Sequence, residues 1–319
     1  MARRFSATIR GSWPITSHNA NVASHGSTHR ITIANNEQRQ NVLVVGGDGL
    51  LGRHTHDRLD TLGLQPWSTT RRSVRAQQRT SLLDLSLGPE QWLLPTARFD
   101  VAIFCVGITS IDACAADPTG TRRINVSQII RLGQLLAARR TRLIYLSTDA
   151  VFDGTTRQPP IEMPTNATSE YGRQMADCEA GLLKLEGSAA VVRLGKVIPP
   201  QMPLFSSWVD ALRNGEPIHP ITNRLVAPIS LDAAVERVID LVVNPTSGIF
   251  HFTAAEDMTY IEAASWFANN LGVSPSLVRP VDSKSSVAQA FERRYVALKN
   301  DHDADRFGAT GFDALETVL

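Results

Sequence analysis

Residues 41–52 read Asn-Val-Leu-Val-Val-Gly-Gly-Asp-Gly-Leu-Leu-Gly, a short apolar run that ends in a glycine-rich turn. The apolar run predicts a buried strand, and a helical pattern continues from the turn to about Leu62. The spacing fits Gly-x-x-Gly-x-x-Gly from Gly46 and also Gly-x-Gly-x-x-Gly from Gly47. Glycines in this turn let the backbone approach a pyrophosphate and direct the helix N-terminus toward it. The stretch therefore predicts the dinucleotide-binding start of a βαβ series, whereas glycines alone would fit any tight turn.

Short apolar strands alternate with longer helices from residue 41 to about residue 195. We expect strands at 41–45, 65–68, 81–83, 101–105, 143–146 and 190–194, and further helices at 122–139 and 171–185. This alternation is typical of βαβ units and a parallel sheet. We therefore predict an α/β fold with a doubly wound parallel Rossmann sheet, in which residues 41–195 form an NAD(P)-binding domain.

The composition of the sequence changes after Gly195, because prolines become frequent. Helical patterns follow at 205–213, 231–243 and 259–271, and one short strand is expected at 249–252. We predict that residues 196–319 form a smaller substrate-binding lobe at the carboxyl edge of the sheet, where α/β folds bind ligands. His251, on the short strand, is expected to be a satisfied core or rim residue and not a catalyst.

The first 40 residues are rich in Ser, Thr, Asn, His and Arg, and Glu37 is their only acid. A segment of this kind buries too little apolar surface to offset the conformational entropy lost on folding, so residues 1–40 are predicted to be a disordered tail. The composition also resembles a transit peptide. A start codon placed too far upstream is a further alternative.

The bulk composition gives no reason to propose a nucleic-acid or membrane-surface partner. The 319 residues are 43% hydrophobic and 20% charged, which allows one large core or two modest ones, and the net charge of +1 favours neither nucleic acid nor a membrane surface. No apolar run approaches the roughly 20 residues that span a bilayer. Cys105, Cys114 and Cys178 lack metal-ligand spacing and are expected to be buried free thiols. We expect a cytoplasmic protein without a metal site, and a homodimer is one option for its assembly.

The second expected strand ends in Ser68-Thr69-Thr70-Arg71-Arg72, where an acid would bind the adenosine ribose of NAD. Two guanidinium groups and three hydroxyls suit a 2′-phosphate, so NADP (NADPH) is favoured over NAD. Two solvated arginines on a loop are the alternative. Asp84, after the third strand, is predicted to meet the adenine amino group or to cap a helix.

A second group of polar residues follows the strand at 143–146. Thr148 and Asp149 stand at its end, Tyr171 follows on the next helix, and Met175 lies four residues later on the same helix face. A hydroxyl at a strand end that faces a tyrosine and a lysine is a proton-transfer site for hydride chemistry. Here the hydroxyl and the phenol are present and the cation is absent. The expected position of Lys196 would let it replace the cation, and a solvated lysine is the alternative.

Together these segments resemble the extended short-chain dehydrogenases, and specifically their dTDP-4-dehydrorhamnose reductase-like (RmlD-like) branch. The marker is residues 146–154, Leu-Ser-Thr-Asp-Ala-Val-Phe-Asp-Gly, which is close to that branch's Ser-Thr-Asp-Tyr-Val-Phe-Asp-Gly. Further support comes from residues 100–109, Asp112, Asn125, residues 171–173, residues 227–228 and residues 248–252. The resemblance covers about residues 41–300.

The resemblance implies that Thr148 and Tyr171 hydrogen-bond a substrate carbonyl, and that the tyrosine donates a proton as NADPH delivers hydride. The family's lysine lowers the phenol's pKa from about 10 and holds the nicotinamide ribose, and Met175 can do neither. The resemblance also implies substrate contacts for Thr109 and Asp149. It further implies cofactor contacts for Gly46, Gly49, Leu50, Leu51, Gly52, Cys105, Val106, Gly107 and Tyr171.

The chain also departs from the family's pattern. Ala150 replaces a pocket tyrosine, Cys105-Val106-Gly107 replaces Asn-Ala-Ala, and Asn223-Arg224 replaces Asp-Gln. Related dehydratases carry Asp-Glu after the threonine, so Ala150 argues against a dehydratase. Asp149 alone would also fit a cap or a turn.

Two main hypotheses of function remain. The first is an NADP-dependent reductase of a 4-keto nucleotide sugar with altered proton-transfer machinery. The second is a catalytically silent relative that binds NADP or a nucleotide sugar as a regulatory or scaffold subunit. Epimerase-type chemistry on a related substrate is a third, weaker option.

Overall fold

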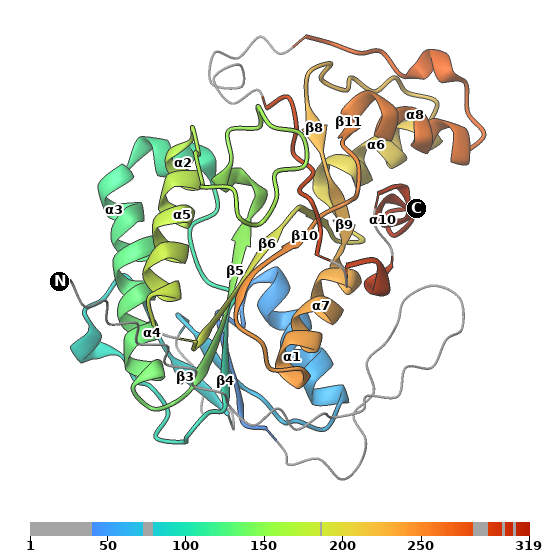
Figure 1. The fold of residues 1–319 in the computed structure, drawn as a ribbon. Helices are drawn as coiled ribbons and strands as arrows, with labels where there is room; N and C mark the ends of the chain where they lie inside the picture. The colour runs from blue at the N-terminus through green and yellow to red at the C-terminus, as the bar shows by residue number, and fades with distance from the viewer. Residues whose placement is uncertain (1–39, 73–78, 186, 283–292, 302–303, 309–310) are drawn as a thin grey trace, which may run out of the picture.

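A seven-stranded parallel sheet forms the centre of the molecule (Figure 1). The computed structural model describes residues 40–72, 79–185, 187–282, 293–301, 304–308 and 311–319. The strand order is β10-β6-β5-β4-β1-β2-β3, and every neighbouring pair is parallel. The strands are β1 (Val42–Val45), β2 (Trp67–Thr70), β3 (Thr80–Leu82), β4 (Val101–Phe104), β5 (Arg142–Thr148), β6 (Ala189–Leu194) and β10 (Gly248–Phe252). The predicted doubly wound α/β class is confirmed.

Helices cover both faces of the sheet, as β1 illustrates. Val42 and Val44 point into a core shared with α1 and α7, whereas Leu43 and Val45 point into a core shared with α4 and α5. All four side chains are fully buried, which explains why the strand reads as a continuous apolar run without alternation. The covering helices are α1 (Leu50–Thr61) and α7 (Leu231–Val243) on one face, and α4 (Ile129–Ala137) and α5 (Glu170–Leu183) on the other (Figure 1).

The helix expected at 122–139 is divided into three parts. It consists of α3 (Pro118–Arg122), a π-helical stretch η2 (Arg123–Gln128) and α4. Single π-helical turns inside longer helices are often found at functional sites. This one carries the buried Asn125.

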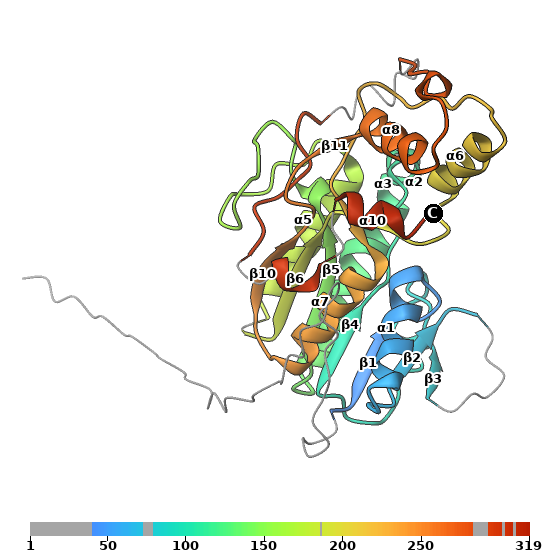
Figure 2. The ribbon, with the colours of Figure 1, turned by 90° about the vertical axis from the view of Figure 1, so that its right-hand side faces the viewer.

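A smaller helical lobe has its own core beyond the end of the sheet, and Figure 2 shows α6, α8 and α10 gathered there. Its elements are α6 (Pro203–Arg213), α8 (Tyr260–Asn270), α10 (Phe312–Glu316), the paired strands β8 (Leu225–Val226) and β11 (Met258–Thr259), and the paired strands β7 (Lys196–Ile198) and β9 (Pro228–Ser230). Single-turn helices are η1 (Pro89–Gln91), η3 (Asp149–Val151), η4 (Pro275–Leu277) and η5 (Ala304–Phe307). Because β6 runs directly into β7, the lobe lies at the carboxyl edge. However, α7 packs against the sheet and β10 is one of its strands, although both follow residue 195. The sheet and its covering helices therefore include residues from both sides of the expected domain boundary at 195.

Some expected boundaries differ from the structure. The second strand begins at Trp67 and not at Gln65, because Gln65 has a φ of 47° that no strand residue adopts. The sequence pattern missed α2 (Ile111–Ala116), which is too short to show a helical period and is capped by the Ser110 hydroxyl. The tail predicted over residues 1–40 lies outside the described residues, except for residue 40.

A buried polar cluster joins α5 to three strands of the sheet. The guanidinium of Arg193 on β6 pairs with the Glu179 carboxylate on α5, with Nη2 and Oε2 2.7 Å apart. Ser147 on β5 donates its hydroxyl to the same carboxylate. His251 on β10 accepts from Arg193 through Nε2 at 3.2 Å and donates from Nδ1 to the Lys299 carbonyl at 3.0 Å, because arginine can only donate. The predicted role of His251 as a satisfied core residue is confirmed.

This environment predicts acid sensitivity. Burial, followed by the charge of Arg193, lowers the pKa of His251 from about 6.5 to about 4. Between about pH 6.5 and pH 4, His251 is therefore protonated in the unfolded chain and neutral in the folded chain. The free energy of unfolding consequently decreases as the pH drops through this range. The loss should approach about 3 kcal/mol, as measured by urea unfolding at a series of pH values.

The amide of His251→Gln can both accept and donate a hydrogen bond but does not titrate. This variant should therefore show a smaller decrease in the free energy of unfolding as the pH falls. His219→Gln, at an exposed histidine, is the control and should leave it unchanged. Equal pH slopes in the wild type and His251→Gln would contradict this account.

Candidate functional site

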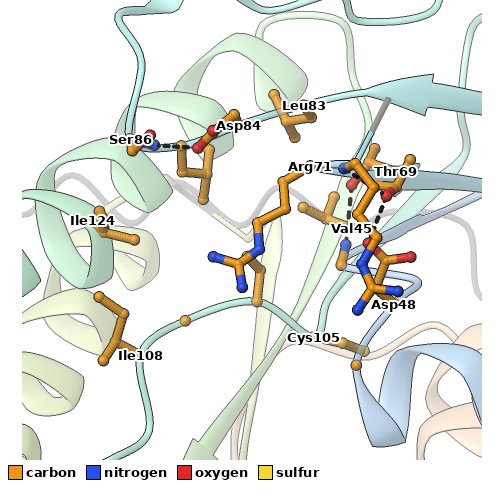
Figure 3. A pocket seen from close by; sticks show the side chains of 17 residues that line it. Val45, Asp48, Thr69, Arg71, Leu83, Asp84, Ser86, Cys105, Ile108 and Ile124 are labelled. Atoms are coloured by element: carbon orange, nitrogen blue, oxygen red, sulfur yellow. Dashed lines mark hydrogen bonds between the residues drawn. The ribbon is translucent and has the colours of Figure 1, made fainter. Parts of the chain in front are cut away.

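A cavity of about 510 Å³ opens at the carboxyl ends of β1, β2 and β4 (Figure 3). Parallel sheets bind ligands at this edge because the strand order reverses between neighbouring crossovers there. Its lining consists of Val45, Gly46, Asp48, Gly49, Thr69, Thr70, Arg71, Arg72, Leu83, Asp84, Leu85, Ser86, Cys105, Val106, Gly107, Ile108 and Ile124. The cavity is therefore bounded by the glycine loop, the end of β2 and the loop after β4.

The glycine loop is fixed by contacts with β2. The backbone N–H of Gly46 donates to Thr69 Oγ1 at 3.0 Å, and that of Gly47 donates to the Thr69 carbonyl at 2.9 Å. Gly46 has a φ of +89°, which favours glycine, and a Cβ at Gly52 would lie 2.2 Å from the Gly46 carbonyl oxygen. The loop and the first turn of α1 can pack this closely only because these residues are glycines.

The first turn of α1 offers hydrogen-bond donors to an anion. No side chain caps the helix, so the backbone N–H groups of Leu50, Leu51 and Gly52 have no intrahelical partner. The partial positive charge of the helix N-terminus adds to them. None of these three residues is among those that line the cavity, so their predicted contacts with a cofactor stay predictions, which would be made through the backbone N–H groups.

Charged side chains surround the other end of the cavity. Arg71 extends into it (Figure 3), and Asp84 accepts from the backbone N–H of Ser86 at 2.8 Å. Hydrogen bonds from Ser86, with the charge of Arg71 as a smaller contribution, lower the pKa of Asp84. Asp84 therefore forms a turn and caps no helix in the described chain. Asp48, a residue of the glycine-rich loop for which the sequence predicted no role, accepts from the Thr70 hydroxyl.

The loop after β4 is held in place by Asn125. Its Oδ1 accepts from the backbone N–H of Ile108 at 2.7 Å, and its Nδ2 donates to the Ile108 carbonyl and to Gln174 Oε1, each at 2.9 Å. The buried amide thus connects the cavity wall with α5. Burial raises the pKa of the Cys105 thiol in this wall to about 12, which keeps it protonated. The three cysteines are free, and Cys114 and Cys178 are buried as expected, whereas Cys105 is only partly exposed to solvent and not fully buried.

The structure places Thr148 beside Tyr171. Thr148 caps η3 by accepting from the Ala150 N–H at 3.2 Å, and Tyr171 lies in the first turn of α5. A Cβ at Gly172 would lie 2.1 Å from the Ala150 carbonyl oxygen, so the glycine lets α5 approach the strand end. Burial and the charge of Asp149 raise the pKa of Tyr171, while a hydrogen bond with Thr148 lowers it. The hydroxyl and the phenol therefore interact, as the spacing predicted.

In the described part of the chain, no cationic side chain forms a hydrogen bond or an ion pair with Tyr171. Met175 is buried, and its Sδ accepts from the Tyr145 hydroxyl at 3.3 Å. Lys196 is exposed on β7, and among the described residues its amine has no hydrogen-bond or ion-pair partner. No direct hydrogen bond therefore joins Lys196 to the phenol, and a role for Lys196 in place of the absent cation stays a prediction. Arg173 points away as expected, because it pairs with Glu170.

Asp149 has an ionic partner that the sequence did not reveal. Its Oδ1 accepts from Thr148 Oγ1 at 3.0 Å, and its Oδ2 lies 3.0 Å from Arg293 Nη1. Arg293 lies far along the chain, so no local motif could connect it to this strand end. Thr109 is exposed and does not line the cavity.

The cavity contains eight of the predicted cofactor residues. These are Gly46, Gly49, Arg71, Arg72, Asp84, Cys105, Val106 and Gly107. The lining also contains Thr69 and Thr70, whose hydroxyls were expected to suit a 2′-phosphate, and the residues that the prediction missed are Val45, Asp48, Leu83, Leu85, Ser86, Ile108 and Ile124. Several of them are one or two positions from a predicted residue, so the motif could have indicated them.

Within the described residues, no group of three or more His, Cys, Asp or Glu side chains is arranged to hold a metal ion. The same part of the chain contains no helix with the length and apolarity needed to cross a bilayer.

Comparisons with known proteins agree with the fold. The family model of the RmlD substrate binding domain matches residues 40–312. A dTDP-4-keto-6-deoxy-D-glucose reductase of Streptomyces niveus is 27% identical over 262 residues, covering 81% of this chain and 88% of the relative. Methionine adenosyltransferase 2 subunit beta of Pongo abelii is 27% identical over 279 residues, covering 80% and 79%.

Solved structures show the same architecture. The dTDP-4-dehydrorhamnose reductase of Bacillus anthracis in complex with NADP aligns with a TM-score of 0.70 at 17% identity, covering 84% of this chain and 92% of that one. MoeE5 in complex with UDP-glucose and NAD aligns with a TM-score of 0.69 at 18% identity, covering 87% and 96%. At these identities the likeness establishes the fold.

The close packing of the glycine loop leads to a stability prediction. Gly52→Ala should destabilise the protein by at least about 2 kcal/mol, because the added Cβ meets backbone and the clash outweighs the gain of about 1 kcal/mol in helix propensity. Gly49→Ala is the matched control, since its Cβ would lie at an ordinary 3.4 Å from the nearest atom. Urea unfolding without cofactor measures both, and equal stabilities would refute the packing argument.

Proposed function

The chain belongs to the RmlD substrate-binding-domain family, and on that basis we propose that it is an NADP-dependent reductase of a 4-keto nucleotide sugar. The observation that carries this proposal is the interaction of Thr148 with Tyr171 at the carboxyl end of β5. A hydroxyl and a phenol beside a dinucleotide-type cavity suit reduction of a carbonyl group. The similarity to a reductase of a dTDP-linked keto sugar supports the substrate class.

The cavity fits a nicotinamide dinucleotide. Its glycine loop, the unpartnered N–H groups of α1 and the arginines after β2 would hold the phosphates, and Asp84 would face the adenine. NADPH, when bound, supplies the hydride. Thr148 then orients the substrate carbonyl, and Tyr171 gives its phenolic proton to the carbonyl oxygen and recovers one from solvent.

A second candidate function is supported by Met175. A buried methionine at the position of the absent lysine suits a protein that binds the cofactor without turnover. The similarity to a subunit named methionine adenosyltransferase 2 subunit beta is consistent with a regulatory or scaffold role. The two candidates differ only in proton transfer, so turnover separates them.

The arginines after β2 predict the choice of cofactor. Isothermal calorimetry should show tighter binding of NADPH than of NADH, because charge-assisted pairs with a 2′-phosphate contribute about 1.5–3 kcal/mol each. Arg71→Ala combined with Arg72→Ala should remove the difference. Arg131→Ala, at an exposed arginine on α4, is the control and should preserve it. Equal affinities in the unmodified protein would refute the preference for NADP.

Proton transfer predicts the effect of restoring a lysine. With a dTDP-4-keto-6-deoxy sugar as substrate, the unmodified protein should oxidise NADPH slowly, as followed by absorbance. Met175→Lys should raise turnover, because a positioned acid–base group typically contributes 10²–10⁴-fold, and should shift the pH profile to lower pH.

Met175→Leu preserves the packing without a charge and should leave the rate unchanged. If both the unmodified protein and a folded, NADPH-binding Met175→Lys variant fail to turn over, the reductase is ruled out in favour of the silent relative.

A further inference from the structure

A guanidinium from the C-terminal part of the chain reaches the candidate catalytic residues. Arg293 Nη1 lies 3.0 Å from Asp149 Oδ2, and the two side chains are only 25% and 12% exposed. Ion pairs on an open surface contribute little, but screening by water weakens as the pair is withdrawn from solvent. The charge of Arg293 therefore acts on the strand end at short range.

The ion pair continues into the catalytic residues. Asp149 accepts from Thr148 Oγ1 through its other oxygen, and Thr148 in turn hydrogen-bonds the Tyr171 phenol. A chain of guanidinium, carboxylate, hydroxyl and phenol thus links the C-terminal segment to α5. In this arrangement the Thr148 hydroxyl donates its proton to Asp149. The hydroxyl must therefore rotate and break this hydrogen bond before it can donate to a substrate carbonyl.

The backbone next to Arg293 is firmly held. The N–H of Tyr295 donates to the Gly154 carbonyl at 3.0 Å, and those of Val296 and Ala297 both donate to Asp257 Oδ1, at 2.8 and 2.7 Å. A Cβ at Gly154 would lie 2.4 Å from Arg293 Cβ, so the two segments are in close contact. Arg293 is therefore fixed over η3 by several bonds and not by the ion pair alone.

Asp149 is the charged group that acts most directly on the phenol. The titratable groups that influence Tyr171 are Asp149 on η3, Cys114 on α2 and Tyr145 on β5. The pKa values of the Cys114 thiol and the Tyr145 phenol are raised, so both are neutral at pH 7. The carboxylate therefore opposes formation of the phenolate, and a cation on that carboxylate weakens the opposition.

We propose that Arg293 is a positioning residue that neutralises Asp149, so that Tyr171 can release its proton and Thr148 can turn toward the substrate carbonyl. The inference rests on the proposed reductase and supplies part of the positive charge that position 175 lacks. Arg293 itself neither gains nor loses a proton. In the reaction, the O–H bond of Tyr171 breaks and a new O–H bond forms on the substrate oxygen as hydride reaches the carbonyl carbon.

The test measures the phenol directly and does not depend on turnover. Trifluorotyrosine incorporated at position 171 is a stronger acid, which brings its titration into the range where the folded protein is stable, and ¹⁹F NMR reads its protonation. Arg293→Met should raise the pKa of this phenol by about one pH unit, because Asp149 is then uncompensated. Arg293→Lys, which keeps the charge, should leave it unchanged.

Two further variants complete the design. Arg293→Met combined with Asp149→Asn should return the pKa to the unmodified value, because neither charge remains. Arg294→Met is the control at an exposed neighbour and should have no effect. An unshifted pKa in folded Arg293→Met, or an equal shift in Arg294→Met, would overturn the inference.

Turnover measured on the same proteins separates the two proposals. A shifted pKa in a protein that never reduces the keto sugar would support the inference and count against the reductase. Turnover with an unshifted phenol would support the reductase and overturn the inference.

Discussion

The buried ion pair between Glu179 and Arg193 is the constraint on which the site depends. Two charges removed from water cost several kcal/mol each, and only complete hydrogen bonding offsets that cost. Here Ser147, Arg193 and His251 supply the missing partners. Since Ser147 precedes Thr148 and Glu179 lies two turns after Tyr171 on α5, the same pair fixes the strand end relative to the helix. Loss of either partner would leave a buried charge uncompensated, at a cost of about 3–5 kcal/mol.

The cofactor half and the proton-transfer half of the site are held by different means. The glycine loop is positioned by neighbouring strands and by contacts within a dozen residues. Thr148 and Tyr171 depend instead on α5, on the Gly172 contact and on the buried ion pair. Met175 illustrates this division, because it packs in the core beside Tyr145 and does not line the cavity. Under the proposed function, a substitution such as that at Met175 would therefore affect proton transfer without altering the residues that line the cofactor cavity.

The same division explains what the sequence could predict. The strand–loop–helix at the N-terminal end and the spacing of Thr148 and Tyr171 are local patterns, and the structure places those residues as the patterns indicated. The ion pair of Asp149 with Arg293 could not be predicted, because it joins segments far apart in sequence and depends on how the C-terminal segment is bonded. The return of β10 to the sheet was missed for the same reason, since its four apolar or aromatic residues say nothing about which strand they pair with. Asp48 is a different case, because it stands inside the recognised loop and only its side-chain partner was unforeseen.

The charges around the phenol bear on the choice between the two proposed functions. An arginine that stayed in water would avoid the cost of desolvation, so a guanidinium partly withdrawn from water beside Asp149 calls for an explanation. The C-terminal segment is bonded to the loops after β5 and β10, and Arg293 is directed at the carboxylate next to Thr148. Desolvation of Arg293 must be offset by something, and the Asp149 carboxylate is the group positioned to do so. Under the proposed reductase, Arg293 would supply part of the positive charge that Met175 cannot, and the ion pair with Asp149 connects the C-terminal segment with the chemistry proposed for Tyr171.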